Sequence, residues 1–193
     1  MGKAARPRMT ITTKQAILLC LLAEAVAESI CLFWYGAGAG GALVGARVTA
    51  RVSAMVFSLA LALRTRPALG ASLMYGFVAA HAMHYASVVY LASVAVHHHL
   101  QQPSVRSVVV VSFGVLLLAV IAATTQARQG SVRRVNTVAV SVAWLTFLGG
   151  VALNGPENWP AFLPLLPLLA ALGYHLRAVA AQRRAAAMTA GAS

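Results

Sequence analysis

Long apolar segments alternate along the chain with short breaks that are polar or rich in glycine and proline. Each segment approaches or exceeds the roughly 20 residues that a helix needs to cross the hydrocarbon core of a bilayer. The six segments cover residues 15–35, 43–63, 68–96, 105–124, 135–153 and 161–180. This pattern predicts an all-α integral membrane bundle of six transmembrane helices.

The breaks between the segments carry residues that end helices. The glycine-rich sequence AGAGGA separates the first segment from the second, and Pro67 and the Gly155-Pro156 pair mark later turns. No part of the chain is left for a separate soluble domain. We expect three regions: a basic cytoplasmic N-terminus (1–14), a transmembrane domain (15–180) and a cytoplasmic C-terminal tail (181–193).

The composition agrees with a membrane protein. Hydrophobic residues make up 60% of the chain and charged residues 9%, whereas soluble domains carry about 25% charged residues. The formal net charge of +12 would also suit a nucleic-acid-binding protein. The basic residues, however, stand in short clusters between apolar segments and form no patch with interleaved aromatic residues. No nucleic acid is therefore expected as a partner.

The positions of the basic residues predict the orientation, because short cytoplasmic loops are enriched in Lys and Arg. We expect a multi-pass protein of the cell inner membrane, surrounded by the lipid bilayer, with both termini in the cytoplasm. A signal peptide cleaved near Ala27 is the alternative for the first segment, although its apolar character continues to Tyr35. With the N-terminus inside, the cytoplasmic side holds twelve of the 15 basic residues: Lys3, Arg6, Arg8, Lys14, Arg64, Arg66, Arg128, Arg133, Arg134, Arg177, Arg183 and Arg184.

Two charged pairs lie inside the predicted membrane helices. Glu24 and Glu28 are four residues apart in the first segment, and Arg47 and Arg51 are four apart in the second. The two helices run in opposite directions, so that Glu28 and Arg51 should lie at similar depth and pair. Such a pair either fixes how the helices dock or belongs to a functional site, in which Glu24 relays protons. A third interpretation is a metal path that also uses Cys20 and Cys31.

Histidines occupy the third and sixth segments. His81 and His84 lie near the middle of the third, about 60° apart on a helix, and His98 follows His84 on the same face about 21 Å higher. His175 lies in the sixth segment at a depth close to that of His81. This spacing suits axial ligands of haem iron. The alternatives are hydrogen bonds between helices for His81 and His84, and solvated imidazoles in an outer loop for His97, His98 and His99.

One motif resembles a known family. The sequence RVTARVSAMVF from Arg47 to Phe57, followed by Leu73-x3-Phe77-x3-His81-x2-His84, is similar to the ferric-reductase-like transmembrane domain family. The resemblance implies a six-helix haem b bundle in which His84 and His98 are ligands, and Arg47 and Arg51 are placed to neutralise haem propionates.

The chain departs from the pattern of this family in two places. The fifth segment has no histidine, so that His175 is the only candidate for a partner ligand, and Gly70-Ala71 replaces the Arg-Arg pair that often precedes the third helix in the family. No flavin or nucleotide-binding domain is expected either, so electrons would come from a separate redox partner protein or from quinol.

Three functions follow from these observations. The first is transmembrane electron transfer through b-type haem, with His84 or His81 as one axial ligand and His175 as the other. The second is a degenerate, cofactor-free scaffold or interaction protein, which would not be an enzyme. The third is a metal or proton transporter. No Ser-His-Asp set or pair of carboxylates in a loop suggests hydrolysis, and the sequence does not decide whether the protein is an enzyme.

Overall fold

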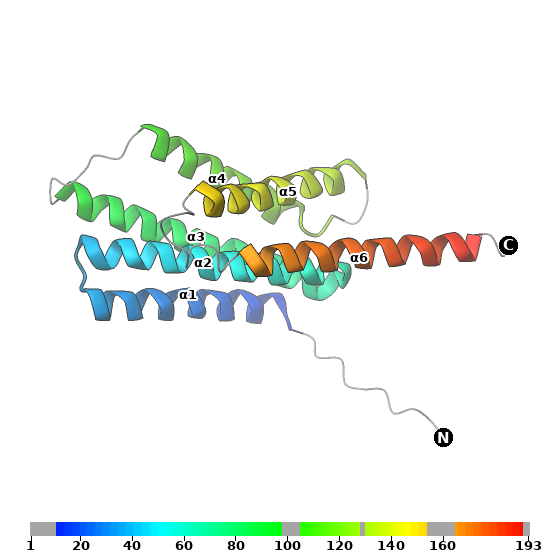
Figure 1. Ribbon diagram of the computed structural model, residues 1–193, viewed down its shortest axis with the longest axis horizontal. Helices are drawn as coiled ribbons and strands as arrows, with labels where there is room; N and C mark the ends of the chain where they lie inside the picture. The colour runs from blue at the N-terminus through cyan, green and yellow to red at the C-terminus, as the bar shows by residue number, and fades with distance from the viewer. Residues whose placement is uncertain (1–10, 98–104, 128–129, 154–164, 191–193) are drawn as a thin grey trace, which may run out of the picture.

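The computed structural model describes residues 11–97, 105–127, 130–153 and 165–190 as helices joined by short turns (Figure 1). These ranges contain six α-helices and one short 3-10 helix but no strand, which confirms the predicted all-α class for this part of the chain. The helices are α1 (Thr13–Tyr35), α2 (Ala39–Ala62), η1 (Leu63–Thr65), α3 (Pro67–His97), α4 (Val105–Thr124), α5 (Gly130–Leu153) and α6 (Leu165–Ala190).

Three of these helices are long and apolar enough to cross a membrane. They are Thr13–Tyr35, Ala39–Thr65, which joins α2 to η1, and Pro67–Ala95. Two shorter apolar stretches, Val108–Thr124 in α4 and Leu166–Ala181 in α6, fall below the length of a full span. The membrane character predicted from the sequence therefore rests on α1, α2 and α3, and the count of six spans stays a prediction.

Helix boundaries differ from the apolar segments where charged or small residues continue a helix. α5 begins at Gly130, five residues before the predicted start, and so includes Arg133 and Arg134. α6 continues to Ala190, through most of the expected C-terminal tail. Alanine and arginine favour the helix strongly, so that the loss of hydropathy near residue 181 ends the apolar surface without ending the helix.

α1, α2 and α3 lie side by side and run alternately in opposite directions (Figure 1). The turn from α1 to α2 is tight. Gly36 has a φ of 80°, which glycine adopts readily. Gly41 packs so closely against this turn that a side chain there would overlap the carbonyl oxygen of Gly36. The Gly-rich sequence thus forms both the turn and the first residues of α2.

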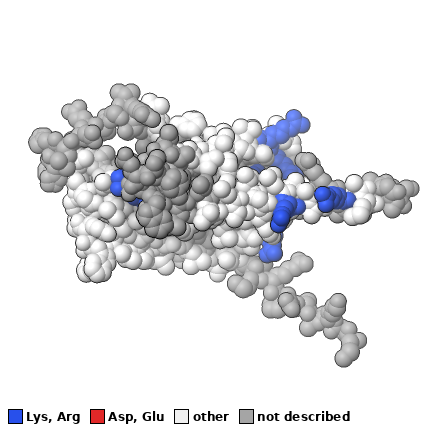
Figure 2. All heavy atoms as spheres, viewed as in Figure 1, with Lys and Arg blue, Asp and Glu red and all other residues white. Residues whose placement is uncertain are grey.

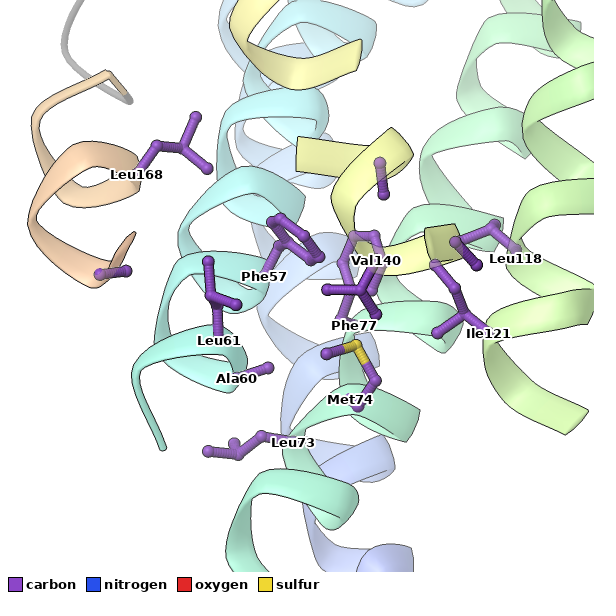
Figure 3. Packing of buried hydrophobic residues seen from close by; sticks show 13 residues of the cluster. Phe57, Ala60, Leu61, Leu73, Met74, Phe77, Leu118, Ile121, Val140 and Leu168 are labelled. Carbon is purple, nitrogen blue, oxygen red and sulfur yellow. The ribbon is translucent and has the colours of Figure 1, made fainter. Parts of the chain in front are cut away.

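An aromatic cluster joins the first three helices to the second half of the chain (Figure 3). The ring centroid of Phe57 in α2 lies 4.8 Å from that of Phe77 in α3 and 5.4 Å from that of Phe147 in α5. Such tilted arrangements are favourable beyond the area they bury. Leu118 and Ile121 from α4 and Leu168 from α6 complete this core.

The outer surface is largely apolar, and the charges gather at its ends. α1 exposes large hydrophobic side chains along its length, among them Leu18, Leu22 and Phe33, which a soluble protein would bury. Figure 2 shows Lys and Arg mainly at the end of the bundle where α2 is joined to α3, with a further group at the opposite end. This distribution is expected for a helix bundle in a bilayer.

Candidate functional site

Buried and half-buried polar side chains run along the interface of α1, α2 and α3. We call this set the polar seam; it consists of Thr13, Glu24 and Glu28 of α1, Thr49 and Ser53 of α2, and Ser72, His84 and Ser87 of α3. Two of its contacts, Thr13 Oγ1 to Ser72 Oγ at 3.2 Å and Ser87 to Glu28, both join residues 59 apart. α1 and α3 therefore keep one register over 15 residues, or about 22 Å of helix.

Glu24 is the most deeply buried member of the seam. Its side chain has 0% exposure. The Ser53 hydroxyl, which is also fully buried, donates to Glu24 Oε1 at 2.7 Å. The second carboxyl oxygen, Oε2, has no hydrogen-bond partner in the described part of the chain. A carboxyl group inside a spanning helix is costly and is a functional-site candidate for that reason.

Glu28 lies one turn further along α1 and contacts both neighbouring helices. Its Oε2 accepts a hydrogen bond from the hydroxyl of Ser87, which also lies 3.3 Å from the Met83 carbonyl oxygen. On the other side, a Cβ placed on Gly45 would be 3.3 Å from Glu28 Oε1. The absence of a side chain at Gly45 therefore lets α2 approach this carboxylate.

The predicted ion pair between Glu28 and Arg51 is wrong. Among the described side chains, Glu28 bonds to Ser87 and no ion pair with Arg51 or Arg47 forms. Arg51 does not lie on the face of α2 that meets Glu28. Thr49 is fully buried in the interface, and Arg51 lies two residues later, about 200° around the helix.

His84 is oriented by a hydrogen bond to α2. Its Nδ1 lies 3.1 Å from Thr49 Oγ1, which in turn lies 3.0 Å from the carbonyl oxygen of Gly45 and 3.2 Å from that of Ala46. A hydroxyl group has a single proton. When the Thr49 hydroxyl donates to one of these carbonyls, its oxygen can accept from an Nδ1–H of His84, and in that tautomer Nε2 carries a lone pair.

His81 is enclosed by aromatic rings. Its ring centroid lies 4.8 Å from that of Tyr85, 5.1 Å from those of His84 and Phe147, and 5.5 Å from that of Phe77. Its Nδ1 is buried without a hydrogen-bond partner in the described ranges. The structure thus brings His81 and His84 together, at the junction of the polar seam and the aromatic cluster.

His175 does not join these two histidines. α6 runs in the same direction as α2 (Figure 1), and its Leu168 packs in the core that contains Phe57 and Phe77. His175 follows Leu168 by seven residues toward Arg64, whose charge acts on it, and His81 follows Phe77 by four residues in the opposite direction. Among the described residues, the ring contacts of His81 and His84 are with each other, Tyr85, Phe77 and Phe147, and none of them is with His175.

Of the histidines predicted as haem ligands, the two that lie together in the described residues, His81 and His84, belong to one helix, α3. His81 and His84 approach from one side only, and α5 offers the ring of Phe147 next to them. His175 makes no ring contact with either of them, and His98 lies outside the described residues. The described residues also contain no group of three or more His, Cys, Asp or Glu side chains that could hold a metal ion. Cys20 and Cys31 are buried free thiols.

The hydroxyl groups of the seam were not predicted from the sequence. Thr49 and Ser53 are four residues apart on α2, which is the spacing of one helix face, and Gly45 precedes them at the same interval. Small and hydroxyl-bearing residues at this interval mark close contacts between membrane helices. That pattern would have identified the face of α2 that meets Glu24 and Glu28.

Comparison of the chain with protein-family models, with curated proteins and with solved structures finds no match. The function is therefore inferred from the geometry of the chain itself.

Proposed function

We propose that this protein transfers protons within the membrane along the polar seam, with Glu24 as the central proton carrier. The observation that supports the proposal is the burial of the Glu24 side chain, together with the lack of a partner for one of its oxygens among the described residues. Glu24 is fully buried in a helix long enough to span the bilayer, with one oxygen on Ser53 and the other without a partner among the described residues. Carboxyl and imidazole groups in such positions form the proton relays of membrane pumps and transporters.

The outer half of the proposed proton route contains several groups, one after another along the bundle, that can exchange protons. Glu28 follows Glu24 by four residues, about 6 Å along α1, and it bonds to Ser87 of α3. His84 and Thr49 face each other between α3 and α2. A carboxyl group, a hydroxyl group and an imidazole can each accept one proton and release another, so neighbouring members of the seam can exchange protons.

The inner half has fewer polar groups. Cys20 lies one turn inward from Glu24, and the Thr13 and Ser72 hydroxyls form a hydrogen bond near the start of α1. Glu24 and Thr13 are 11 residues apart, or about 16 Å. A proton route across this distance requires bound water, which polar interior sites of proteins can hold.

We propose the cell inner membrane as the location, with six spans and both termini in the cytoplasm. The three long apolar helices support a membrane location. The gathering of basic side chains at one end of the bundle supports the orientation (Figure 2).

Transmembrane electron transfer through b-type haem is the rival function, with a separate redox partner or quinol as the source of electrons. The hydrogen bond between Thr49 and Nδ1 of His84 favours it, since a histidine ligand usually has its other ring nitrogen held by a hydrogen bond. A cofactor-free scaffold is the other rival, in which the same hydrogen bonds only dock the helices.

An absorption spectrum separates the haem function from the other two. We expect protein purified in detergent from haem-replete cells to show no Soret band. A Soret band that is lost in His84→Ala would support the electron carrier, and its persistence in His175→Ala would identify His84 as the ligand.

Proton flux separates transfer from a scaffold. Purified protein is reconstituted into vesicles that contain a pH-sensitive dye, and a potassium gradient with valinomycin drives proton entry. We expect wild-type vesicles to acidify faster than protein-free vesicles, and Glu24→Gln to reduce the protein-dependent rate by roughly tenfold or more, as for removal of a group that transfers protons. Ser29→Ala, an exposed change on the same helix, serves as the control and should leave the rate unchanged. Equal rates for wild type and Glu24→Gln would contradict the proposal.

A further inference from the structure

Two histidines lie side by side on α3. His81 and His84 are three residues apart, and the distance between their ring centroids is 5.1 Å. Two imidazoles that bind one tetrahedral metal ion, each through a nitrogen at about 2.0–2.1 Å, have ring centroids about 5 Å apart. The observed separation therefore matches the separation expected for two histidines on one ion.

One ring nitrogen of His81 lacks a partner. Its Nδ1 is buried without a hydrogen bond among the described residues, although a polar group shielded from water is costly when it is left unpaired. A buried polar atom of this kind calls for an explanation, and a bound water or ion is one of the common explanations. A metal ion would give this imidazole the partner that the described chain does not provide.

The ring of His84 is held as the rings of metal ligands are held. Thr49 Oγ1 lies 3.1 Å from His84 Nδ1 and 3.0 Å from the carbonyl oxygen of Gly45, so that α2 fixes the orientation of the imidazole. Histidines that bind metals usually have their second ring nitrogen held by such an outer hydrogen bond. Coordination through Nε2 requires the ring proton to be on Nδ1, where the Thr49 oxygen can accept it.

The surroundings of the pair suit a cation that enters from outside. Both histidines are half-buried, so that part of their surface is open to an ion, while aromatic rings from α3 and α5 pack around His81. A carboxylate lies nearby, because Glu28 accepts a hydrogen bond from Ser87, which follows His84 by three residues, or about 4.5 Å along α3. Its negative charge lowers the cost of a cation at this depth.

We propose that His81 and His84 together bind a transition-metal ion of the kind that imidazole prefers, zinc or copper. The two rings supply two ligands, and the remaining positions of the ion are open to water or to another molecule. The described residues contain no group of three possible metal-binding side chains, so we expect an exchangeable ion rather than a permanently held one. The site goes beyond the proposed proton route, because His81 lies outside the polar seam and metal binding is measured without proton flux.

The test measures metal binding by the whole chain, purified in detergent without a histidine tag. Three consecutive histidines occupy residues 97–99, and short histidine tracts also bind metals, so all three are changed to glutamine in every sample. The probes are Zn²⁺, Cu⁺ and Mg²⁺, each titrated against a competing chelator. We expect saturable binding of one ion per chain for Zn²⁺ or Cu⁺, the tighter of which identifies the metal, and none for Mg²⁺, which prefers oxygen ligands.

Two variants remove the ligands and keep the packing. His81→Phe keeps an aromatic ring among its neighbours, and His84→Asn keeps an N–H donor for Thr49. Each should weaken binding at least about a hundredfold, whereas Thr49→Val, which removes only the outer hydrogen bond, should weaken it about tenfold. His175→Gln is the matched control and should bind as its parent does, because His175 makes no ring contact with the pair among the described residues.

X-ray absorption by the bound metal provides a measurement that needs no variant of the pair. The spectrum should show two imidazole ligands on the ion. Fewer than two imidazoles would overturn the proposal, and so would unchanged binding in His81→Phe and His84→Asn, an equal loss in His175→Gln, or the absence of saturable binding of both Zn²⁺ and Cu⁺.

Discussion

At the scale of single residues, serine hydroxyls provide the hydrogen bond that each of the two carboxyl groups of the polar seam accepts. Glu24 and Glu28 each accept a hydrogen bond from a serine on a neighbouring helix, and the arginines of α2 take no part in these contacts. A hydroxyl donor satisfies one lone pair of a carboxyl oxygen without bringing a second charge into the bilayer. This arrangement leaves the carboxyl group able to gain and lose a proton, as the proposed function requires.

The hydrogen bond between Ser87 and Glu28 leads to a prediction on stability. Glu28→Ala removes the acceptor of Ser87 and should lower the free energy of unfolding by about 1–2 kcal/mol. Glu28→Gln keeps an acceptor oxygen and should cost less. Adding Arg51→Ala to Glu28→Ala should bring no recovery, because the two side chains form no ion pair and independent changes add. Unfolding in detergent measures all three, and a double variant more stable than Glu28→Ala would show that the ion pair exists.

At the scale of elements, small residues determine how closely α1, α2 and α3 approach. Gly76 of α3 faces Cys20 and Ala16 of α1. A Cβ at Gly76 would lie 2.7 Å from Cys20 Sγ and 3.1 Å from the Ala16 carbonyl oxygen. Both distances are shorter than van der Waals contact, so a methyl group there pushes the two helices apart.

Gly76→Ala should therefore destabilise the bundle, by about 1–3 kcal/mol, which is typical of an overpacked interior. Adding Cys20→Ala removes the sulfur atom and should restore part of this loss. Gly173→Ala is the matched control, because a Cβ at Gly173 has no neighbour within 4 Å and alanine favours the helix. Thermal unfolding compares the three variants. The close contact would be refuted by a Gly76→Ala protein that melts at or above the wild-type temperature.

The helices themselves could largely be predicted from the sequence, because a spanning helix needs an unbroken apolar run. α4 was predicted with both of its ends, Val105 and Thr124. The sequence did not predict the start of α5 or the end of α6. Hydropathy indicates the apolar part of a helix and not its ends. The face on which each charged residue lies could not be predicted by counting along the chain, since Gly45 and Thr49, rather than the charges, determine the packing of α2.

At the scale of the whole molecule, the distribution of charge predicts the orientation. Lys14 lies at the start of α1, and Arg64 and Arg66 lie where α2 is joined to α3, at the end of the bundle that should face the cytoplasm (Figure 1). Most of the visible Lys and Arg side chains gather at this end (Figure 2). Reporter fusions after Arg66 and Arg134 and at the C-terminus should therefore read cytoplasmic, and a fusion at Gly38 should read periplasmic. A periplasmic C-terminus would show that the number of spans is odd.

The most direct test of the central claim is whether Glu24 takes up and releases a proton inside the bilayer. Infrared difference spectra of reconstituted protein, recorded as the external pH is changed, report the C=O stretch of a protonated carboxyl group. The account predicts a band that changes reversibly with pH, is absent in Glu24→Gln and persists in Ser29→Ala. Spectra of wild type and Glu24→Gln that are identical across the pH range in which the protein stays folded would contradict it, and would leave the polar seam as a device that only docks the helices.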